Sequence, residues 1–333
     1  MPSSTLRDQL HRDGFVVIRG VLSPTQLVAL QEATARADAL GRSGAWPHVR
    51  TVGKQFPPWD AAEAPTRGIW GVQGLNDPAL AQAASAAAAG GEAEVVKAGW
   101  DDHAAFLRAY FGDEVLGPAK ELMAPCDDDD LVMELHNLLV RPSADFELRW
   151  HRDDVPPEAT VEEELAKLGV VPGGDGDLRP RQQLHAQWNL ALRDGDDSLV
   201  VVPGSHRRAR TETERAADPY AESLPGQLVV RLDAGDAVFY NNNILHRGRY
   251  SAGRDRATLH GSVGHAAGAR SGKRATNVLQ HGVGAYVDRC DFAGVFAGYP
   301  DEERLRKRAE GMRDRLVELG KTAGADVGFS LKG

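Results

Sequence analysis

Apolar residues recur in short runs, many of them β-branched, along most of the chain. Glycine and proline turns separate these runs, and each run has the length of a strand rather than of a helix. The predicted strands span residues 15–18, 131–140, 184–192, 199–202, 228–232, 237–240 and 256–263. Short strands at such spacing are typical of a sandwich, a barrel or a jelly roll.

Helix signals lie around and between these strands. Ser23 is placed as an N-cap, Pro24 at the first helical position and Gln26 at the capping-box position, so a helix is predicted over 24–40. An alanine-rich stretch at 77–106, interrupted by two glycines, predicts a helix, a break and a second helix. Leucine and methionine at helical spacing predict a C-terminal amphipathic helix at about 301–320.

One segment interrupts the strand series at about 156–180. Thr160 and Glu163 form a second capping box, which predicts a short helix over 161–168, and glycine and aspartate make 173–177 a loop. Loops of this length within a compact domain are usually functional, so we expect a lid over a binding pocket.

The strands are dispersed between residues 15 and 263 without a linker-like stretch. We therefore expect a single domain over residues 1–333, mostly β with flanking helices. Its predicted core is a double-stranded β-helix, that is, a jelly roll of the cupin type.

Composition narrows the class of ligand. The net charge of −9 argues against a nucleic-acid partner, which usually requires a basic face, and favours a small-molecule substrate. The two cysteines, Cys126 and Cys290, exclude a disulfide framework. The N-terminus lacks a signal peptide's apolar stretch and no run is long enough to span a bilayer, so we expect a cytoplasmic protein without membrane contact.

Candidate chemistry centres on Trp150-His151-Arg152-Asp153-Asp154. A His-X-Asp pair on extended backbone places both side chains on one face and supplies two metal ligands. His246, which follows a predicted turn and strand, is the candidate third ligand. Two histidines and one carboxylate form the facial triad of non-haem iron(II) oxygenases, which leaves coordination positions open.

The pattern alone is weak, because His11-Arg12-Asp13 repeats it where a surface helix joins a strand. Arg256 strengthens the case for His151. On the strand 256–263, alternation places Arg256, Thr258 and His260 on one face. A buried guanidinium requires a carboxylate partner, which a dicarboxylic co-substrate would supply. The alternative is that Arg256 lies on a solvated face beside Arg254.

The chain resembles the phytanoyl-CoA dioxygenase family of iron(II)- and 2-oxoglutarate-dependent oxygenases. The resemblance begins with RDGFVVIRGVLSPTQL at 12–27 and continues through WHRDD at 150–154. It extends over WNLALRDGDDSLVVVPGSHRRA at 188–209 and GDAVFYNNNILHRG at 235–248, to the arginine at 256. PGSH is a turn typical of the family, which makes His206 structural.

The resemblance implies Fe(II) on His151, Asp153 and His246, with O2 and 2-oxoglutarate as co-substrates. It places Arg256 on the distal carboxylate of 2-oxoglutarate and adds Asn137 and Trp188 as co-substrate contacts, although core packing is an equal alternative for Trp188. Gln73, Thr258 and His260 are further pocket positions, while His265 and His281 have no assigned role. Family members often carry a basic residue on an early strand, but residues 69–73 offer none.

The predicted enzyme is an oxidoreductase that hydroxylates, desaturates or cyclises a small molecule and releases succinate and CO2. Two alternatives remain at this stage. A cupin-like metal enzyme that does not use 2-oxoglutarate would share the metal ligands but leave Arg256 without a role. A catalytically silent binding protein on the same fold would tolerate loss of His151.

Overall fold

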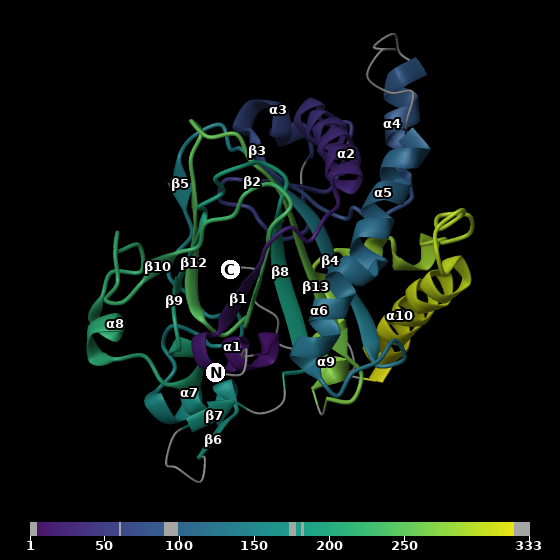
Figure 1. The fold of residues 1–333 in the computed structure, drawn as a ribbon. Helices are drawn as coiled ribbons and strands as arrows, with labels where there is room; N and C mark the ends of the chain where they lie inside the picture. The colour runs from purple at the N-terminus through teal and green to yellow at the C-terminus, as the bar shows by residue number, and fades with distance from the viewer. Residues whose placement is uncertain are drawn as a thin grey trace.

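The computed structural model describes residues 5–59, 61–89, 99–172, 178–180, 183–268 and 270–322. Its strands form a seven-stranded sheet, a four-stranded sheet and a small two-stranded sheet. The two larger sheets face each other as a sandwich, with the four-stranded sheet on the left and the seven-stranded sheet on the right of Figure 1.

All strand pairs are antiparallel. The large sheet has the order β1 (Phe15–Ile18), β11 (Ala237–Tyr240), β8 (His185–Ala191), β13 (Ala257–His265), β4 (Leu131–Val140), β3 (Ile69–Val72) and β2 (Val49–Thr51). The small sheet has the order β10 (Leu228–Val229), β9 (Leu199–Val202), β12 (Leu245–Tyr250) and β5 (Phe146–Glu147). Strands β6 (Val170–Pro172) and β7 (Leu178–Pro180) form the third sheet.

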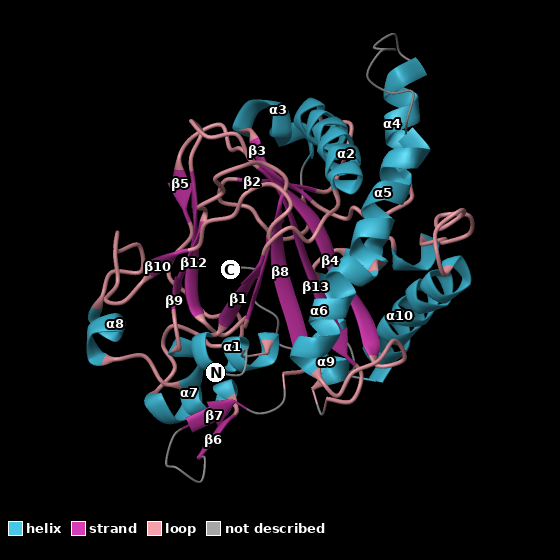
Figure 2. Cartoon of the chain, in the orientation of Figure 1, coloured by secondary structure: helices cyan, strands magenta, loops and turns pink. Residues whose placement is uncertain are grey.

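Helices gather mainly beside the large sheet, as Figure 2 shows. They are α1 (Leu6–Asp13), α2 (Pro24–Ser43), α3 (Ala64–Arg67), α4 (Ala79–Ala89), α5 (Gly99–Phe111), α6 (Asp113–Met123), α7 (Val161–Leu168), α8 (Glu212–Ala216), α9 (Ser271–Gln280) and α10 (Glu302–Thr322). The predicted capping boxes are confirmed: Ser23 accepts from the amide of Gln26, and Thr160 accepts from that of Glu163. The predicted C-terminal helix is confirmed as α10.

The outer face of the large sheet packs on helices and forms the main hydrophobic core. Helix α2 contacts β3, α6 contacts β8, and α10 contacts β4. Trp188, Phe239 and Leu259 from three central strands belong to this core and are almost fully buried. Burial of these apolar side chains stabilises the contact between sheet and helices.

The inner face of the large sheet is apolar at one end and polar at the other. Val238 of β11 packs there against Leu199 and Val201 of β9. Residues paired directly across neighbouring strands share a face, and His260 is paired with both Asn189 and Asn137. The polar part of the inner face therefore runs across β8, β13 and β4.

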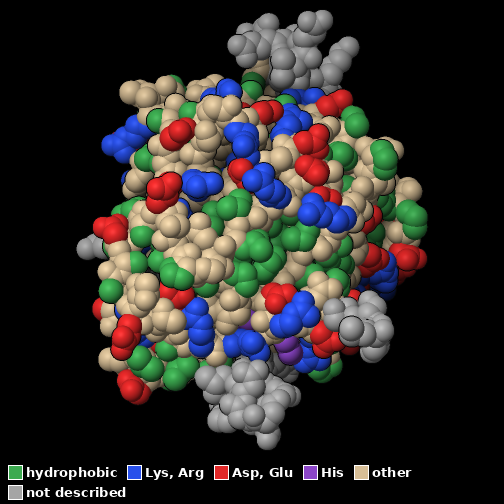
Figure 3. All heavy atoms as spheres, turned by 60° about the vertical axis from the view of Figure 1, so that its left-hand side comes forward, with side chains coloured by type: hydrophobic (Ala, Val, Ile, Leu, Met, Phe, Trp, Pro, Cys, Tyr) green, Lys and Arg blue, Asp and Glu red, His purple; other side chains and the backbone are tan. Residues whose placement is uncertain are grey.

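The predicted mostly-β jelly-roll class with flanking helices is confirmed by this architecture. Both cysteines are free thiols, as expected. Among the described residues, no helix is long and apolar enough to cross a membrane. On the face shown in Figure 3, Lys and Arg side chains are interspersed with Asp and Glu side chains, so that face does not present one sign of charge. The single-domain assignment remains a prediction.

Candidate metal centre

Backbone pairing with the start of β12 positions the His-X-Asp segment. His151 and His246 exchange both backbone hydrogen bonds at 3.0 Å, and the amide of Asp153 donates to the carbonyl of Asn242 at 3.0 Å. The segment thus continues the small sheet beyond β5 as an extended edge. This pairing brings His246 next to His151 and Asp153, which precede it by more than ninety positions in the sequence.

The three side chains converge. Nε2 of His151 lies 3.5 Å from Oδ1 of Asp153, and Nε2 of His246 lies 3.7 Å from the same oxygen. The imidazole centroids of the two histidines are 4.3 Å apart. A single ion with ligand distances of about 2.0–2.2 Å can bridge atoms at this spacing. The predicted triad therefore has the geometry of a metal site.

Both histidines are held in the orientation that a ligand requires. Nδ1 of His151 donates to the carbonyl of Arg149 at 2.8 Å, and Nδ1 of His246 donates to the carbonyl of Ile244 at 2.8 Å. Each bond fixes the tautomer that leaves the lone pair on Nε2. Burial, followed by the nearby His151, lowers the pKa of His246 to about 4, so its imidazole is neutral at pH 7.

Arg256 directly precedes β13, one of the three strands that carry the polar part of the inner face, here called the inner wall. It already has a carboxylate partner. Its Nε donates at 3.3 Å to Asp196, and its guanidinium lies 4.7 Å from the ring centre of Tyr250. Burial would raise the pKa of Asp196, but the charge of Arg256 and bonds from Thr258 and Ser198 lower it. Nη1 of Arg256 is buried without a partner among the described residues. The expectation that a co-substrate supplies the main counter-charge is thus corrected, while one donor remains open.

Several other buried donors on this wall lack an acceptor. Asn137 accepts at Oδ1 from the amide of Gly74 at 3.2 Å, but its Nδ2 has no partner within the described residues. Nε2 of Gln73 is also buried and unpaired there. A buried donor without an acceptor costs about 1–3 kcal/mol. The wall therefore has the donor set of a surface that binds an oxygen-rich ligand.

The remaining predicted pocket positions share this face. Thr258 is paired with Leu139 and Ala191 across β4 and β8, and its hydroxyl donates to Asp196. Nδ1 of His260 lies 2.9 Å from Oδ1 of Asn189. Burial, followed by the charges of Arg50 and Arg256, lowers the pKa of His260 to about 3. His260 therefore lies on the pocket wall as a neutral, hydrogen-bonded histidine.

Trp188 does not lie on this wall, and its predicted contact with the co-substrate is wrong in position. It is paired with Gly261, whose position alternates with those of His260 and Ser262. A Cβ on Gly261 would lie 2.3 Å from Cζ2 of Trp188, so the glycine makes room for the indole on the outer face. The neighbours Gln187 and Asn189 occupy the inner face instead.

Sequence reasoning missed two arginines near the candidate metal ligands, namely Arg50, which is partly buried, and Arg152, which is buried. Arg50 of β2 is paired with Gly71 of β3, and its side chain lies beside the pocket wall. Arg152 lies between the two ligands His151 and Asp153 and is 4% exposed. Arginine between ligands could have been recognised from the motif, but Arg50 required the register of β2 on β3.

A donor set of two histidines and one carboxylate, facing a wall of unpaired donors, is characteristic of non-haem iron oxygenases. The sequence profile described as phytanoyl-CoA dioxygenase (PhyH) matches residues 10–257. The chain belongs to the phytanoyl-CoA dioxygenase family. As a member, it is a 2-oxoglutarate-dependent non-haem iron oxygenase, and the predicted family is confirmed.

Solved structures similar to this family member share little sequence with it. AviO1 from Streptomyces viridochromogenes Tue57 is 20% identical, with a TM-score of 0.46, over 79% of this chain and 96% of that one. HygX from Streptomyces hygroscopicus, solved with nickel and 2-oxoglutarate bound, is 18% identical, with a TM-score of 0.47, over 78% and 87%. EctD from S. alaskensis with bound Fe is 17% identical, with a TM-score of 0.46, over 79% and 77%. No curated protein matches the sequence.

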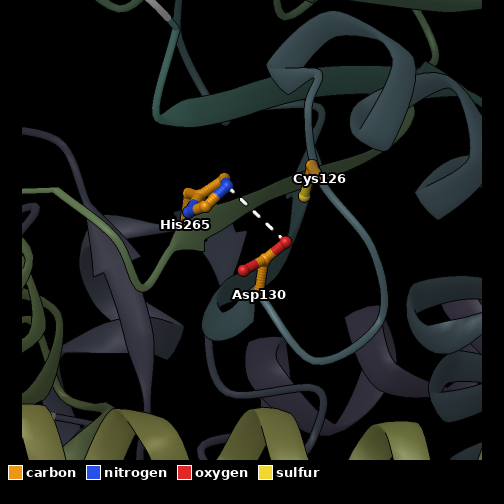
Figure 4. Close-up of side chains that lie close together, drawn as sticks. All are labelled: Cys126, Asp130 and His265. Carbon is orange, nitrogen blue, oxygen red and sulfur yellow. Dashed lines mark ion pairs between the residues drawn. The ribbon is translucent and has the colours of Figure 1, made fainter.

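A second cluster with metal-binding side chains joins Cys126, Asp130 and His265 (Figure 4). Nδ1 of His265 accepts from the amide of Ala267 at 3.1 Å, and its Nε2 donates to the carbonyl of Pro125 at 3.1 Å. Burial and acidic neighbours raise the pKa of Cys126 to about 12, which keeps the thiol protonated. This cluster thus ties the end of β13 to the loop that precedes β4, and it lacks the free imidazole lone pair that the triad provides.

The other histidines considered in the sequence have structural contacts. The carbonyl of His11 accepts from Nε2 of His206 at 3.2 Å, and Arg12 pairs with Asp13 on the surface. His11 and Asp13 form no metal-binding group within the described chain. These contacts support the structural role that was expected for both His11 and His206. His281 lies with its ring 5.0 Å from that of Phe56.

Arg152 links the metal segment of this dioxygenase family member to helix α7. Its guanidinium donates to the carbonyls of Ser205 at 2.9 Å and Asn243 at 2.6 Å. Its Nε lies 2.9 Å from Glu164 of α7, a carboxylate that is 0% exposed and also pairs with Arg210 and Arg215. The excursion predicted as a lid is thus anchored through a buried ion cluster next to the ligands.

We expect Glu164→Gln to weaken both the fold and the metal site. Removing one partner of a buried ion cluster costs about 3–5 kcal/mol in the free energy of unfolding. Loss of support behind metal ligands typically lowers metal affinity by about 10- to 100-fold. Urea unfolding and competitive Fe(II) titration measure the two effects.

Glu163→Gln is the matched control, because Glu163 lies on the same helix and glutamine can keep its capping box. This variant should leave both quantities nearly unchanged. Wild-type Fe(II) affinity in a folded Glu164→Gln protein would show that α7 does not position the ligands.

Proposed function

We propose that the protein binds Fe(II) through His151, Asp153 and His246 and oxidises a small organic substrate, most simply by hydroxylation, with conversion of 2-oxoglutarate to succinate and CO2. The observation that carries the proposal is the position of the triad opposite the unpaired donors of Arg256 and Asn137. Iron with bound 2-oxoglutarate and O2 would supply the oxidising chemistry.

The chain's own residues account for binding and orientation. The open Nη1 of Arg256 is suited to the distal carboxylate of 2-oxoglutarate, with Asp196 fixing the guanidinium from the other side. Charge-assisted hydrogen bonds of this kind contribute about 1.5–3 kcal/mol each. Asn137 adds a neutral donor on the neighbouring strand. The proposal therefore assigns the inner wall to the co-substrate and the triad to the metal.

A carboxylate at Asp153 completes the protein ligand set and favours hydroxylation over halogenation, because halogenating relatives replace that ligand with a small residue. Desaturation and ring closure use the same ligand set and stay within the proposal. Which carbon reacts depends on how the loops present the substrate.

The test is anaerobic addition of Fe(II) and 2-oxoglutarate to the purified protein. A weak visible charge-transfer band is expected from chelation of the metal by the 2-oxo acid, followed in air by slow succinate formation that a true substrate accelerates. Folded protein that binds Fe(II) but gives neither the band nor succinate would instead indicate a metal enzyme that does not use 2-oxoglutarate. Folded protein that binds no Fe(II) would contradict the metal assignment.

A further inference from the structure

Arg50 is a partly buried cation for which the described residues provide no acid. Its guanidinium lies 5.2 Å from the ring centre of Trp70, and its Nε is buried without a hydrogen-bond partner. No described carboxylate forms an ion pair with it, unlike Arg256, Arg152 and Arg274. Burial lowers the pKa of Arg50 to about 10, so the group remains charged at pH 7. A charged group that is partly removed from water, with a buried Nε that has no acceptor, is costly unless a ligand compensates it.

Gly71 makes room for Arg50 and for a second donor. A Cβ at Gly71 would lie 3.4 Å from Cδ of Arg50 and 3.0 Å from Nε2 of Gln73. Both side chains therefore lie over the glycine. Gln73 is 3% exposed, and its Nε2 has no acceptor in the described part of the chain. A guanidinium and an amide thus share one small space with two donors unused.

This space belongs to the inner wall. Gly71 is paired with Arg50 on one side and with Leu139 on the other, and Leu139 is paired with Thr258. Arg50 therefore lies in the same cross-strand row as Thr258 of the inner face. The charge of Arg50 lowers the pKa of His260, as does the candidate ligand His246. It also lowers the pKa of His281, which the candidate ligand Asp153 raises. Arg50 is therefore close to the pocket in which the metal ligands converge.

We propose that Arg50 and Gln73 form a second carboxylate-binding subsite of the pocket, separate from Arg256. This inference rests on the proposed function. A carboxylate would accept from the guanidinium and the amide together and satisfy both. The carboxylate belongs either to 2-oxoglutarate or to the substrate that is oxidised; in the second case the substrate is an organic acid.

The first arm of the test is an anaerobic titration of Fe(II)-loaded protein with 2-oxoglutarate, followed by the visible band. It compares the wild type, Arg50→Gln and the control Arg67→Gln, which removes an equal charge from an arginine whose side chain is 52% exposed. If the carboxylate is that of 2-oxoglutarate, Arg50→Gln raises Kd at least about tenfold, and the control leaves it within twofold of the wild type.

The second arm adds sodium acetate to the Fe(II)–2-oxoglutarate complex at constant ionic strength, with chloride as the comparison salt. If the subsite serves the substrate, the affinity for 2-oxoglutarate is the same in all three proteins. Acetate then raises the unfolding midpoint of the wild type and of Arg67→Gln but not that of Arg50→Gln. Equal 2-oxoglutarate affinity together with no acetate effect that depends on Arg50 would overturn the proposal.

Gln73→Glu keeps the test decisive where Arg50→Gln does not fold. This substitution places a carboxylate beside Arg50, so it should raise the unfolding midpoint and abolish the same ligand effect. If Gln73→Glu changes neither the unfolding midpoint nor the ligand effect, the proposed subsite is also contradicted. Failure of the proposed function has a different result, since no protein in the series, wild type included, would then give the band.

Discussion

His246→Ala is expected to abolish 2-oxoglutarate turnover and to lower Fe(II) affinity by more than about 100-fold. Changes that merely disturb the support of a metal ligand cost about 10- to 100-fold, and this change removes the ligand itself. His246 is 5% exposed and its Nε2 lies 3.7 Å from Asp153. The described residues add no fourth His, Cys, Asp or Glu to this group that could replace it. Competitive Fe(II) titration and succinate release measure the loss.

Cys126→Ala is the control for this prediction, because Cys126 belongs to the other cluster with metal-binding side chains. It should leave the Fe(II) stoichiometry and succinate release unchanged. If Cys126→Ala lost the iron while His246→Ala retained it, the two clusters would have been assigned the wrong way round.

Arg256→Gln is expected to weaken 2-oxoglutarate binding by about 10- to 150-fold, which corresponds to one charge-assisted hydrogen bond of about 1.5–3 kcal/mol. Arg256→Lys should recover only part of the affinity, because an ammonium cannot reproduce the planar fork between Asp196 and the co-substrate. The measurements are Kd from the anaerobic band and KM for 2-oxoglutarate in the succinate assay.

Arg254→Gln is the matched control, because Arg254 lies two residues earlier and pairs with Asp197, with its side chain 48% exposed. It removes the same charge without facing the inner wall. An unchanged Kd in folded Arg256→Gln would assign the distal carboxylate to another cation, for which Arg50 is the evident candidate.

Local signals in the sequence were sufficient for about half of the described helices and strands, although β12, which carries His246, was not predicted. The capping boxes at Ser23 and Thr160 define helix starts because they depend on contacts within four residues. The apolar runs became β1, β4 and β11 because strand length and turn residues are also local. The triad could be proposed from the His-X-Asp spacing with a later histidine, and pairing of His151 with His246 brought it together.

The error at Trp188 has a definite cause. Every residue of β8 is buried, so its sequence shows no alternation between a buried and an exposed face. The polar residues Gln187 and Asn189 were the signal for the inner face, since buried amides require partners. In a strand that is buried on both faces, the few polar residues indicate which face lines the pocket, and the aromatic residue does not.

The sequence by itself therefore determined the main helices and strands, the fold class and the candidate metal ligands, because each depends on periodicity, capping or a short motif. Only the tertiary structure decided which charges meet. Asp196 pairs with Arg256 from sixty positions away, Glu164 reaches Arg152 from α7, and Arg50 reaches the inner wall over Gly71. Such contacts depend on strand register and helix docking, so the predicted iron centre gained its surrounding charges from the fold.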